Sequence, residues 1–306
     1  MMTRPNLCVI FNPTAGKHRG RRRLEQIRKT WGTEVEFRPT LHTGHGIELA
    51  EQAGREGFPV VAAAGGDGTA HEVLNGLMRV RNPDVQFTII PIGSANDYAF
   101  SLGLDQKNPP AARRVDVGIV RAPSGKSVYF GCCLGMGFNG RVTWEARRIH
   151  LLQGVFLYGL ATLRALIHHY RCPLMTLNID DEPAWTTPTL LFSTLNGKRE
   201  GGFVLAPKAE MDDGWLDFVH AADLTRWEIL KFLPRLALFG PPPEYPKIRQ
   251  GRCRRVKLYS EVPLIIHADG EFFCVPEDGI KDVEIEIVPG ALGISPLSPA
   301  GERGRG

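Results

Sequence analysis

The sequence predicts an α/β domain with a mainly parallel sheet, followed by an antiparallel β-sandwich domain. Short apolar runs alternate with helical patterns in the first third of the chain, which is typical of βαβ units. From about Arg114 onward, short strand-like runs follow one another with turn residues between them, and this favours a sandwich. We place the α/β domain at 1–120, the sandwich with inserted helices at 121–295 and a flexible tail at 296–306.

The elements of the α/β domain follow from their hydrophobic periodicity and from the loops that separate them. The continuous apolar run 58–64 is what a strand buried on both faces of a parallel sheet requires. The expected strands are 7–11, 35–38, 58–64 and 86–92, and the expected helices are one ending near 31, then 46–56, 71–80 and a short one after 97.

Two helical stretches, 151–170 and 227–239, interrupt the strands of the second domain. The first is long and apolar, but a central arginine such as Arg164 costs about 2.5–3.5 kcal/mol in a membrane, so we expect a helix that does not span one. Pro234 predicts that the second helix bends or ends there. The expected strands are 115–121, 128–133, 175–179, 190–194, 216–220, 255–259 and 283–288.

Composition indicates an ordinary globular protein. Of the 306 residues, 43% are apolar and 23% are charged, which excludes general disorder. The net charge of +4 is too small to indicate a nucleic-acid partner. The six cysteines form no CxxC pair and no zinc-ligand spacing, so we expect reduced structural thiols and a cytoplasmic protein. The start of the chain offers no room for a signal peptide.

Three strands of the α/β domain end in polar or glycine-rich loops, at 12–17, 65–69 and 93–97. Ligands of open α/β sheets bind outside the carboxyl ends of the strands, so we expect the three loops to open on the same edge. The glycines of 65–69 let backbone N–H groups approach a phosphate, and the following helix N-terminus adds partial positive charge. The loop is not a Walker A loop, because Gly16-Lys17 is followed by His18.

Asp67 stands among these glycines, where its carboxylate would repel a phosphate. A bound Mg²⁺ between the two would reverse the local electrostatics. The alternative is a tight turn in which Asp67 only caps the following helix. The two further converging loops favour the ligand site.

Four motifs, in this order along the chain, resemble those of the diacylglycerol kinase catalytic-domain family. They are Asn12-Pro13-Thr14-Ala15-Gly16-Lys17, the run from Gly65 to Val73, the run from Pro91 to Ala99, and Asp269-Gly270-Glu271. The chain is most similar to the small bacterial lipid kinases of this family, which are related to sphingosine and ceramide kinases. The Gly-Gly-Asp-Gly motif also occurs in NAD kinases and phosphofructokinases, so the resemblance depends on the whole set.

The resemblance implies a two-domain lipid kinase with a phosphofructokinase- or NAD-kinase-like α/β domain and with ATP in the cleft next to the sandwich. Ser94 replaces the usual threonine and keeps the hydroxyl, and His71 replaces a frequent asparagine, as in the sphingosine and ceramide branch. The substrate therefore need not be diacylglycerol. The residues assigned to ATP and its Mg²⁺ are Asn12, Thr40 of the stretch Thr40 to Gly44, Gly65, Gly66, Asp67, Gly68, Thr69, Ala70, His71, Glu72, Ser94, Asn96 and Asp97.

Asp269-Gly270-Glu271 follows an apolar run, and its glycine indicates a turn between strands. Phosphoryl transfer requires a group that takes the proton of the acceptor hydroxyl. By resemblance either Asp269 or Glu271 is this base; we prefer Glu271 but the sequence does not decide. Asp67 completes the predicted catalytic set.

A second acidic segment, 210–217, is similar to one that binds a structural Mg²⁺ in related bacterial lipid kinases. Carried over by position, Asp213 would supply a carboxylate, and Glu210 and Trp215 would supply carbonyl oxygens. The alternative is a solvated acidic loop that precedes a strand.

A lipid kinase must meet its substrate at a membrane surface. The basic runs 17–23 and 249–257 and the two apolar helices are candidates for peripheral contact at the inner face of the membrane. The alternative is that the charges form solvated faces and the helices cover the core. A homodimer remains open.

The expected function is transfer of the γ-phosphate of ATP, with Mg²⁺, to a lipid hydroxyl such as that of diacylglycerol or a sphingoid-like lipid in phospholipid metabolism. One alternative is a kinase of a soluble substrate such as NAD, against which the motifs at 12–17 and 91–99 argue. Another is a catalytically silent lipid-binding protein on the same fold, although it would have no need for the carboxylate set.

Overall fold

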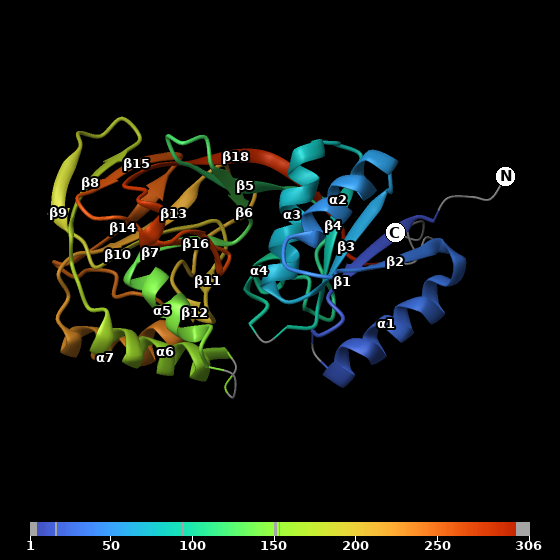
Figure 1. Cartoon of the computed structure of the whole chain (residues 1–306), viewed down its shortest axis with the longest axis horizontal. Helices are drawn as coiled ribbons and strands as arrows, with labels where there is room; N and C mark the ends of the chain where they lie inside the picture. Colours follow the sequence, from blue (N-terminus) through green and yellow to red (C-terminus); the bar gives the residue numbers. More distant parts are fainter. Residues whose placement is uncertain (1–4, 16, 94, 150–151, 153, 298–306) are drawn as a thin grey trace. The chain divides into compact units, whose positions relative to one another are not determined.

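The chain forms two compact units (Figure 1). The first contains Met1–Val115 and Gly290–Gly306, and the second contains Asp116–Pro289. The first is an α/β domain with a parallel sheet and the second an antiparallel β-sandwich, which confirms the predicted fold class. The residues that the computed structural model describes are 5–15, 17–93, 95–149, 152 and 154–297.

The sheet of the first unit has the order β2-β1-β3-β4, with every neighbouring pair parallel. The middle of β3 is a run of three fully buried alanines, because helices pack close to a strand covered on both faces. The strands are β1 (Leu7–Phe11), β2 (Val35–Pro39), β3 (Val60–Gly65) and β4 (Gln86–Pro91).

The end of the last strand, β18 (Asp282–Ile294), lies in the first unit from Gly290 onward, whereas the sequence places the sandwich at 121–295. Gly293 and Ile294 pair in parallel with Gln86 and Phe87 of β4. An apolar strand pattern does not reveal which strand it pairs with. The pairing of the end of β18 with β4 could therefore not be predicted from the sequence. Leu297, from the predicted flexible tail, packs against the core of the first unit, and residues 298–306 lie outside the described ones.

Helices α2 and α3 of the first unit lie against one another. A Cβ on Gly76 would lie 2.3 Å from the carbonyl oxygen of Ile47, so only glycine allows this close approach. The helices of this unit are α1 (Lys17–Trp31), the 3₁₀ helix η1 (Gly32–Glu34), α2 (His45–Glu56), α3 (Asp67–Val80) and α4 (Asp97–Leu102).

The second unit contains two antiparallel sheets. One has β18, β15 and β8 in its centre, with β9 at one edge and β5 and β6 beyond β18; the other has the order β14-β13-β10-β7-β16-β17. The strands are β5 (Arg113–Arg121), β6 (Ser127–Phe130), β7 (Cys133–Gly137), β8 (Leu174–Ile179), β9 (Trp185–Pro188), β10 (Leu191–Leu195), β13 (Leu216–Ala221), β14 (Ile248–Cys253), β15 (Arg255–Ser260), β16 (Ile266–Ala268) and β17 (Glu271–Cys274), with a small hairpin β11 (Arg199–Glu200) and β12 (Phe203–Val204).

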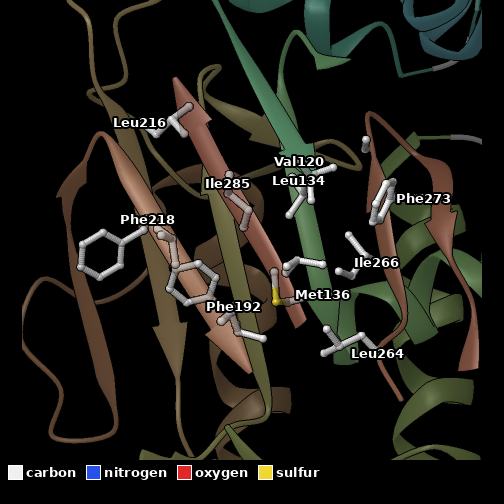
Figure 2. Packing of buried hydrophobic residues seen from close by; sticks show 14 of the residues in the cluster. Val120, Leu134, Met136, Phe192, Leu216, Phe218, Leu264, Ile266, Phe273 and Ile285 are labelled. Carbon is white, nitrogen blue, oxygen red and sulfur yellow. The ribbon is translucent and has the colours of Figure 1, made fainter. Parts of the chain in front are cut away.

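The core of the second unit lies between these two sheets, and Figure 2 shows its packing. Met136 of β7 and Phe192 of β10 face Ile285 of β18 in the same cluster. Alternate residues of β8, β15 and β18 belong to this core, which is the period-2 pattern that predicts a sandwich.

Three helices cover the six-stranded sheet: α5 (Phe138–Ala146), α6 (Gly154–His168) and α7 (Arg226–Leu238), and a 3₁₀ helix η2 (Pro276–Asp278) follows β17. Helix α7 begins at a capping box formed by Thr225 and Glu228 and continues through Pro234 to Leu238, so of the two expected outcomes at Pro234, a bend or an end, the end does not occur. Among the described residues, no helix has both the length and the apolar character needed to cross a bilayer.

All six cysteines are free thiols. Burial raises the pKa of Cys8 and of Cys274 to about 12, so these side chains stay protonated and pack as small apolar groups.

Candidate active site

The polar loops of the first unit meet at one edge of its sheet, as the sequence predicts. The strands are in register, with Phe11 opposite both Pro39 and Ala64, so their carboxyl ends are level. The loops are then joined by backbone hydrogen bonds, from Asn12 N to Ala64 O (3.2 Å) and from Thr40 N to Phe11 O (2.8 Å). The segments that begin with Asn12, Thr40 and Gly66 therefore lie side by side.

The glycines of the turn after β3 are required by close contacts. A Cβ on Gly65 would lie 2.2 Å from Thr69 Oγ1. A Cβ on Gly93 would lie 2.4 Å from Gly66 Cα, so the turn after β4 touches the turn after β3 through backbone alone. The N–H of Gly93 donates to Gly65 O at 3.1 Å, so the amides that suit a phosphate are those at the start of α3, which have no acceptor within the helix.

Helix α3 begins at Asp67, four residues earlier than predicted. Asp67 therefore lies in the first helical turn, where the partial positive charge of the helix N-terminus stabilises a carboxylate. Its Oδ1 also accepts a hydrogen bond from the backbone N–H of Tyr98 (3.2 Å), in the first turn of α4. The carboxylate is thus fixed beside the starts of two helices.

Asn96 and Asp97 stand at the start of α4. Asn96 has a left-handed backbone (φ 53°) and donates from Nδ2 to Gly93 O at 2.9 Å. Its Oδ1 is buried and has no hydrogen-bond partner among the residues that the structure describes. Asp97 is buried in the first turn of α4, and Ser94 lies outside the described residues.

The oxygen atoms of this turn suit a hard cation. Mg²⁺ in proteins takes one or two carboxylates, retains waters and accepts phosphate oxygens of a substrate. Asp67 supplies a carboxylate oxygen, and the buried Oδ1 of Asn96 supplies an acceptor without a partner in the described part of the chain. The described residues contain no cluster of three or more His, Cys, Asp or Glu side chains, so the phosphates would have to complete such a site.

Glu72 has a different position from the other residues assigned to the nucleotide. Its two carboxylate oxygens accept the backbone N–H groups of Gly44 (2.7 Å) and Gly46 (2.9 Å). It therefore fixes the stretch from Thr40 to Gly44 and satisfies the orphan donors at the start of α2. The carboxylate acts here as the support of a neighbouring loop.

His71 is buried on α3, where its Nε2 lies 3.3 Å from Asn75 Nδ2. Asn12 forms an Asx turn, because its Oδ1 accepts from both the N–H and the hydroxyl of Thr14, at 2.9 and 2.8 Å. Both side chains therefore have local partners in the first unit.

In the second unit, Asp269 is pinned by backbone donors. Its Oδ2 accepts from Gly131 N at 2.8 Å, and its Oδ1 accepts from Cys132 N and Cys133 N at 2.8 and 3.0 Å. The residue is buried and has a left-handed backbone (φ 52°). Three charge-assisted hydrogen bonds hold this turn to the start of β7. The carboxylate of Asp269 therefore has a structural role.

Glu271 opens β17, and its side chain is accessible to solvent. Its Oε2 forms an ion pair with Nη2 of Arg147 at 2.7 Å, and the same nitrogen donates to Gly270 O at 2.9 Å. The guanidinium also lies 4.5 Å from the centre of the Phe272 ring. Arg147 therefore orients Glu271 on an open surface. Of the two acids in this motif, Glu271 is the one with a carboxylate that a substrate can reach.

A buried pair that sequence reasoning missed supports the same turn. His267 Nδ1 accepts the N–H of Gly270 at 3.3 Å, so Nε2 carries the proton and donates to Glu200 Oε1 at 2.9 Å. Glu200 comes from the hairpin of β11 and β12, far away in the sequence. Only the adjacency of His267 to the Asp269 motif could have drawn attention to it.

The acidic segment 210–217 is built around Asp213. One of its oxygens forms an ion pair with Arg252, and the other accepts from Trp215 N at 3.0 Å. Glu210 is exposed. The predicted structural Mg²⁺ stays a prediction, and an ion there would share Asp213 with the arginine.

Comparison with known proteins gives matches over both units. Residues 6–124 match the family model described as the diacylglycerol kinase catalytic domain. Residues 132–295 match the YegS C-terminal NAD kinase beta sandwich-like domain.

Individual relatives cover most of the chain. It is 30% identical to a diacylglycerol kinase of Mycobacterium tuberculosis over 254 aligned residues. The alignment covers 80% of this chain and 79% of that protein. It is also 31% identical to the "Probable lipid kinase YegS-like" of Chromohalobacter salexigens over 279 aligned residues. This alignment covers 85% of this chain and 83% of that protein. A crystal structure of a diacylglycerol kinase from Bacillus anthracis has a TM-score of 0.69 at 17% identity over 97% of this chain and 98% of that one, a likeness of fold.

Proposed function

The chain belongs to the diacylglycerol kinase catalytic-domain family, and we propose that it transfers the γ-phosphate of ATP to a hydroxyl group of a lipid. The observation that carries the proposal is the turn of Gly65, Gly66 and Gly93, whose backbones touch beside the Asp67 carboxylate. This turn leads into the N-terminus of α3, where amide donors have no acceptor within the helix, and its acid needs a cation when phosphates are present.

In this proposal the first unit binds the nucleotide. Amide groups at the start of α3 donate to the phosphate oxygens, and the Asn12 turn and the Thr40 stretch form the neighbouring walls. Glu72 keeps the Thr40 stretch in place through its two backbone contacts. Asp67 and Asn96 would hold Mg²⁺, which supplies neutralisation of the charge between Asp67 and the phosphates.

Glu271 is the general base of the proposed reaction. It takes the proton of the acceptor hydroxyl while the hydroxyl oxygen bonds to the γ-phosphorus, and ADP leaves with the electron pair of the broken P–O bond. Its accessible carboxylate and its fixed orientation beside Arg147 support this role. The three backbone donors on Asp269 make that residue the anchor of the turn, so we assign it no proton transfer.

The acceptor is a lipid that the protein meets at a membrane surface, from the cytoplasmic side. One relative is a diacylglycerol kinase and another is described only as a lipid kinase, so the proposal extends to lipid hydroxyls as a class. His71, in the position where the family often has asparagine, is compatible with a sphingoid-like acceptor as well as diacylglycerol.

The test is a screen of acceptors with radiolabelled ATP and Mg²⁺. The purified protein is incubated with a lipid extract, with diacylglycerol, with a sphingoid base and with NAD⁺, and labelled products are identified by mass. We expect a labelled lipid phosphate, and Asp67→Asn should form it about 10⁴-fold more slowly. Labelled NADP without any labelled lipid would make the protein a soluble-substrate kinase. Lipid binding without any phosphate transfer at high protein and Mg²⁺ concentrations would make it a silent lipid-binding protein.

A further inference from the structure

Helix α6 exposes large apolar side chains, while its arginine is paired with an acid of the neighbouring helix α5. The side chain of Arg164 is 41% exposed, and its Nε forms an ion pair with the buried Oε2 of Glu145 in α5 at 2.8 Å. Glu145 is almost fully buried and also contacts His169 at 3.1 Å, so these two contacts fix the rotation of α6 about its axis.

The outward side of α6 is a stripe of large apolar residues. Phe156, Leu160, Leu163 and Ile167 follow one another at spacings of four, three and four, and their exposed fractions are 80%, 39%, 43% and 69%. The spacing places them on one face of the helix. The buried face of the helix includes the small residues Ala161 and Ala165, whereas the large side chains of the stripe lie on its exposed face.

Helix α7 adds to the same exposed surface. The two helices contact one another, and Arg226 at the start of α7 donates to the carbonyl oxygen of Leu166 at 2.9 Å. Figure 1 shows them side by side at the lower edge of the second unit. Trp227 and Leu238 of α7 are 81% and 69% exposed.

The charges on this surface are positive. The exposed charged side chains of α7 include Lys231 and Arg235. The acid of that helix, Glu228, is held by the capping box and by an ion pair with Lys247 at 3.1 Å. No acidic residue occurs in α6. A large apolar surface on two described helices whose exposed charges are cations, and whose one acid is paired, is complementary to a layer of apolar chains under anionic headgroups.

We propose that the α6–α7 face is a docking surface for an anionic lipid bilayer. This face consists of Phe156, Leu160, Leu163, Ile167, Trp227 and Leu238. The apolar side chains enter the headgroup region, and Lys231 and Arg235 contact the anionic headgroups. The inference rests on the proposed function for its purpose, since a kinase of membrane lipids needs such a face, but the contact itself can be measured without any catalysis.

The direct test is cosedimentation of the full chain with vesicles, without nucleotide. Vesicles of equal parts phosphatidylglycerol and phosphatidylcholine should bind the wild type, and the Trp fluorescence should shift to the blue, a shift that Trp227→Phe removes. The triple variant Phe156→Ser/Leu163→Ser/Ile167→Ser should partition about tenfold or more weakly, because three side chains no longer enter the apolar layer. Val262→Ser is the matched control: Val262 is a 47% exposed apolar residue of the second unit outside the α6–α7 face, and its replacement should leave vesicle binding unchanged.

The charge contribution is tested separately. Lys231→Gln/Arg235→Gln should weaken binding to the anionic vesicles by about fivefold for each residue replaced, while binding to pure phosphatidylcholine vesicles stays constant. Equal melting temperatures of all variants show that the fold is retained, as expected for exposed positions.

Unchanged partitioning of the triple variant would overturn the proposal, and so would a wild type that does not bind anionic vesicles. A dimer in sedimentation velocity that the triple variant dissociates would assign the face to a second copy of the chain and also overturn it. Turnover of a short-chain lipid dissolved in water separates this proposal from the proposed function. This turnover should be the same in the wild type and in the triple variant. If neither protein turned over the short-chain lipid while the wild type still bound vesicles, the proposed kinase function would be refuted and the docking surface would stand.

Discussion

The two acidic turns of this protein use the same dipeptide, Asp-Gly, in opposite ways. Asp67 begins a helix and stands beside glycine backbones that touch without side chains. Asp269 has a left-handed backbone and directs both carboxylate oxygens into three N–H groups of its own unit. We propose the first acid as a ligand-binding residue, whereas the second anchors its turn and leaves Glu271, two residues later, on the surface.

The difference shows that the hydrogen-bond partners of a carboxylate decide its role, and the motif alone does not. A carboxylate that accepts several backbone N–H groups is stabilised in place, and moving it would leave those donors unsatisfied. A carboxylate at a helix start with an uncovered neighbouring backbone can still bind a cation or take part in proton transfer.

The largest expected effect is that of Asp67→Asn. The amide oxygen can still accept the N–H of Tyr98, so the melting temperature should hardly change. The charge that holds the cation is lost, and several kcal/mol of charge stabilisation should lower kcat by about 10⁴-fold. Radiolabel transfer to lipid measures the rate, and circular dichroism is the control. A rate near that of the wild type would remove Asp67 from the active site.

Glu271→Gln tests the accessible acid of the second turn. The neutral amide cannot take a proton, so we expect kcat to fall by about 10² to 10⁴. The KM for ATP should stay constant, because the nucleotide is assigned to the first unit. Arg147→Gln is the companion variant: it frees Glu271 without removing it and should reduce kcat by less. If Glu271→Gln left the rate intact, the base would have to be sought elsewhere.

Asp269→Asn should chiefly reduce stability. The amide has one acceptor oxygen in place of two, and its NH₂ group would oppose a backbone N–H of the segment 131–133. We expect the free energy of unfolding in urea to fall by about 2–4 kcal/mol. The kcat of the folded fraction should fall less than for Glu271→Gln. A stable Asp269→Asn protein with a lower kcat than Glu271→Gln would reverse the assignment of anchor and base.

Much of the fold and one of the two turns could be predicted from the sequence. The β-strand runs and the loops at 12–17, 65–69 and 93–97 are local patterns, and parallel strands bring their carboxyl ends together without further information. The return of Gly293 and Ile294 to β4 could not be predicted, since a strand pattern does not name its partner. The choice of Glu271 over Asp269 also depends on donors that lie more than 130 positions away in the chain.

The smallest expected effect concerns the pair beneath the second turn. His267 accepts the N–H of Gly270 and donates to the buried Glu200, so it positions the backbone that precedes Glu271. His267→Gln should lower kcat by about threefold to tenfold and leave the KM for ATP unchanged, because a small displacement of the base weakens proton transfer. Glu200→Gln, which still accepts from His267 Nε2, should come close to the wild-type rate. Coupling between the two positions in a double-mutant cycle should amount to about 0.5–3 kcal/mol in stability. Additive effects on both rate and stability would show that the pair does not act on the turn as a unit, and the orientation of Glu271 would then rest on Arg147 alone.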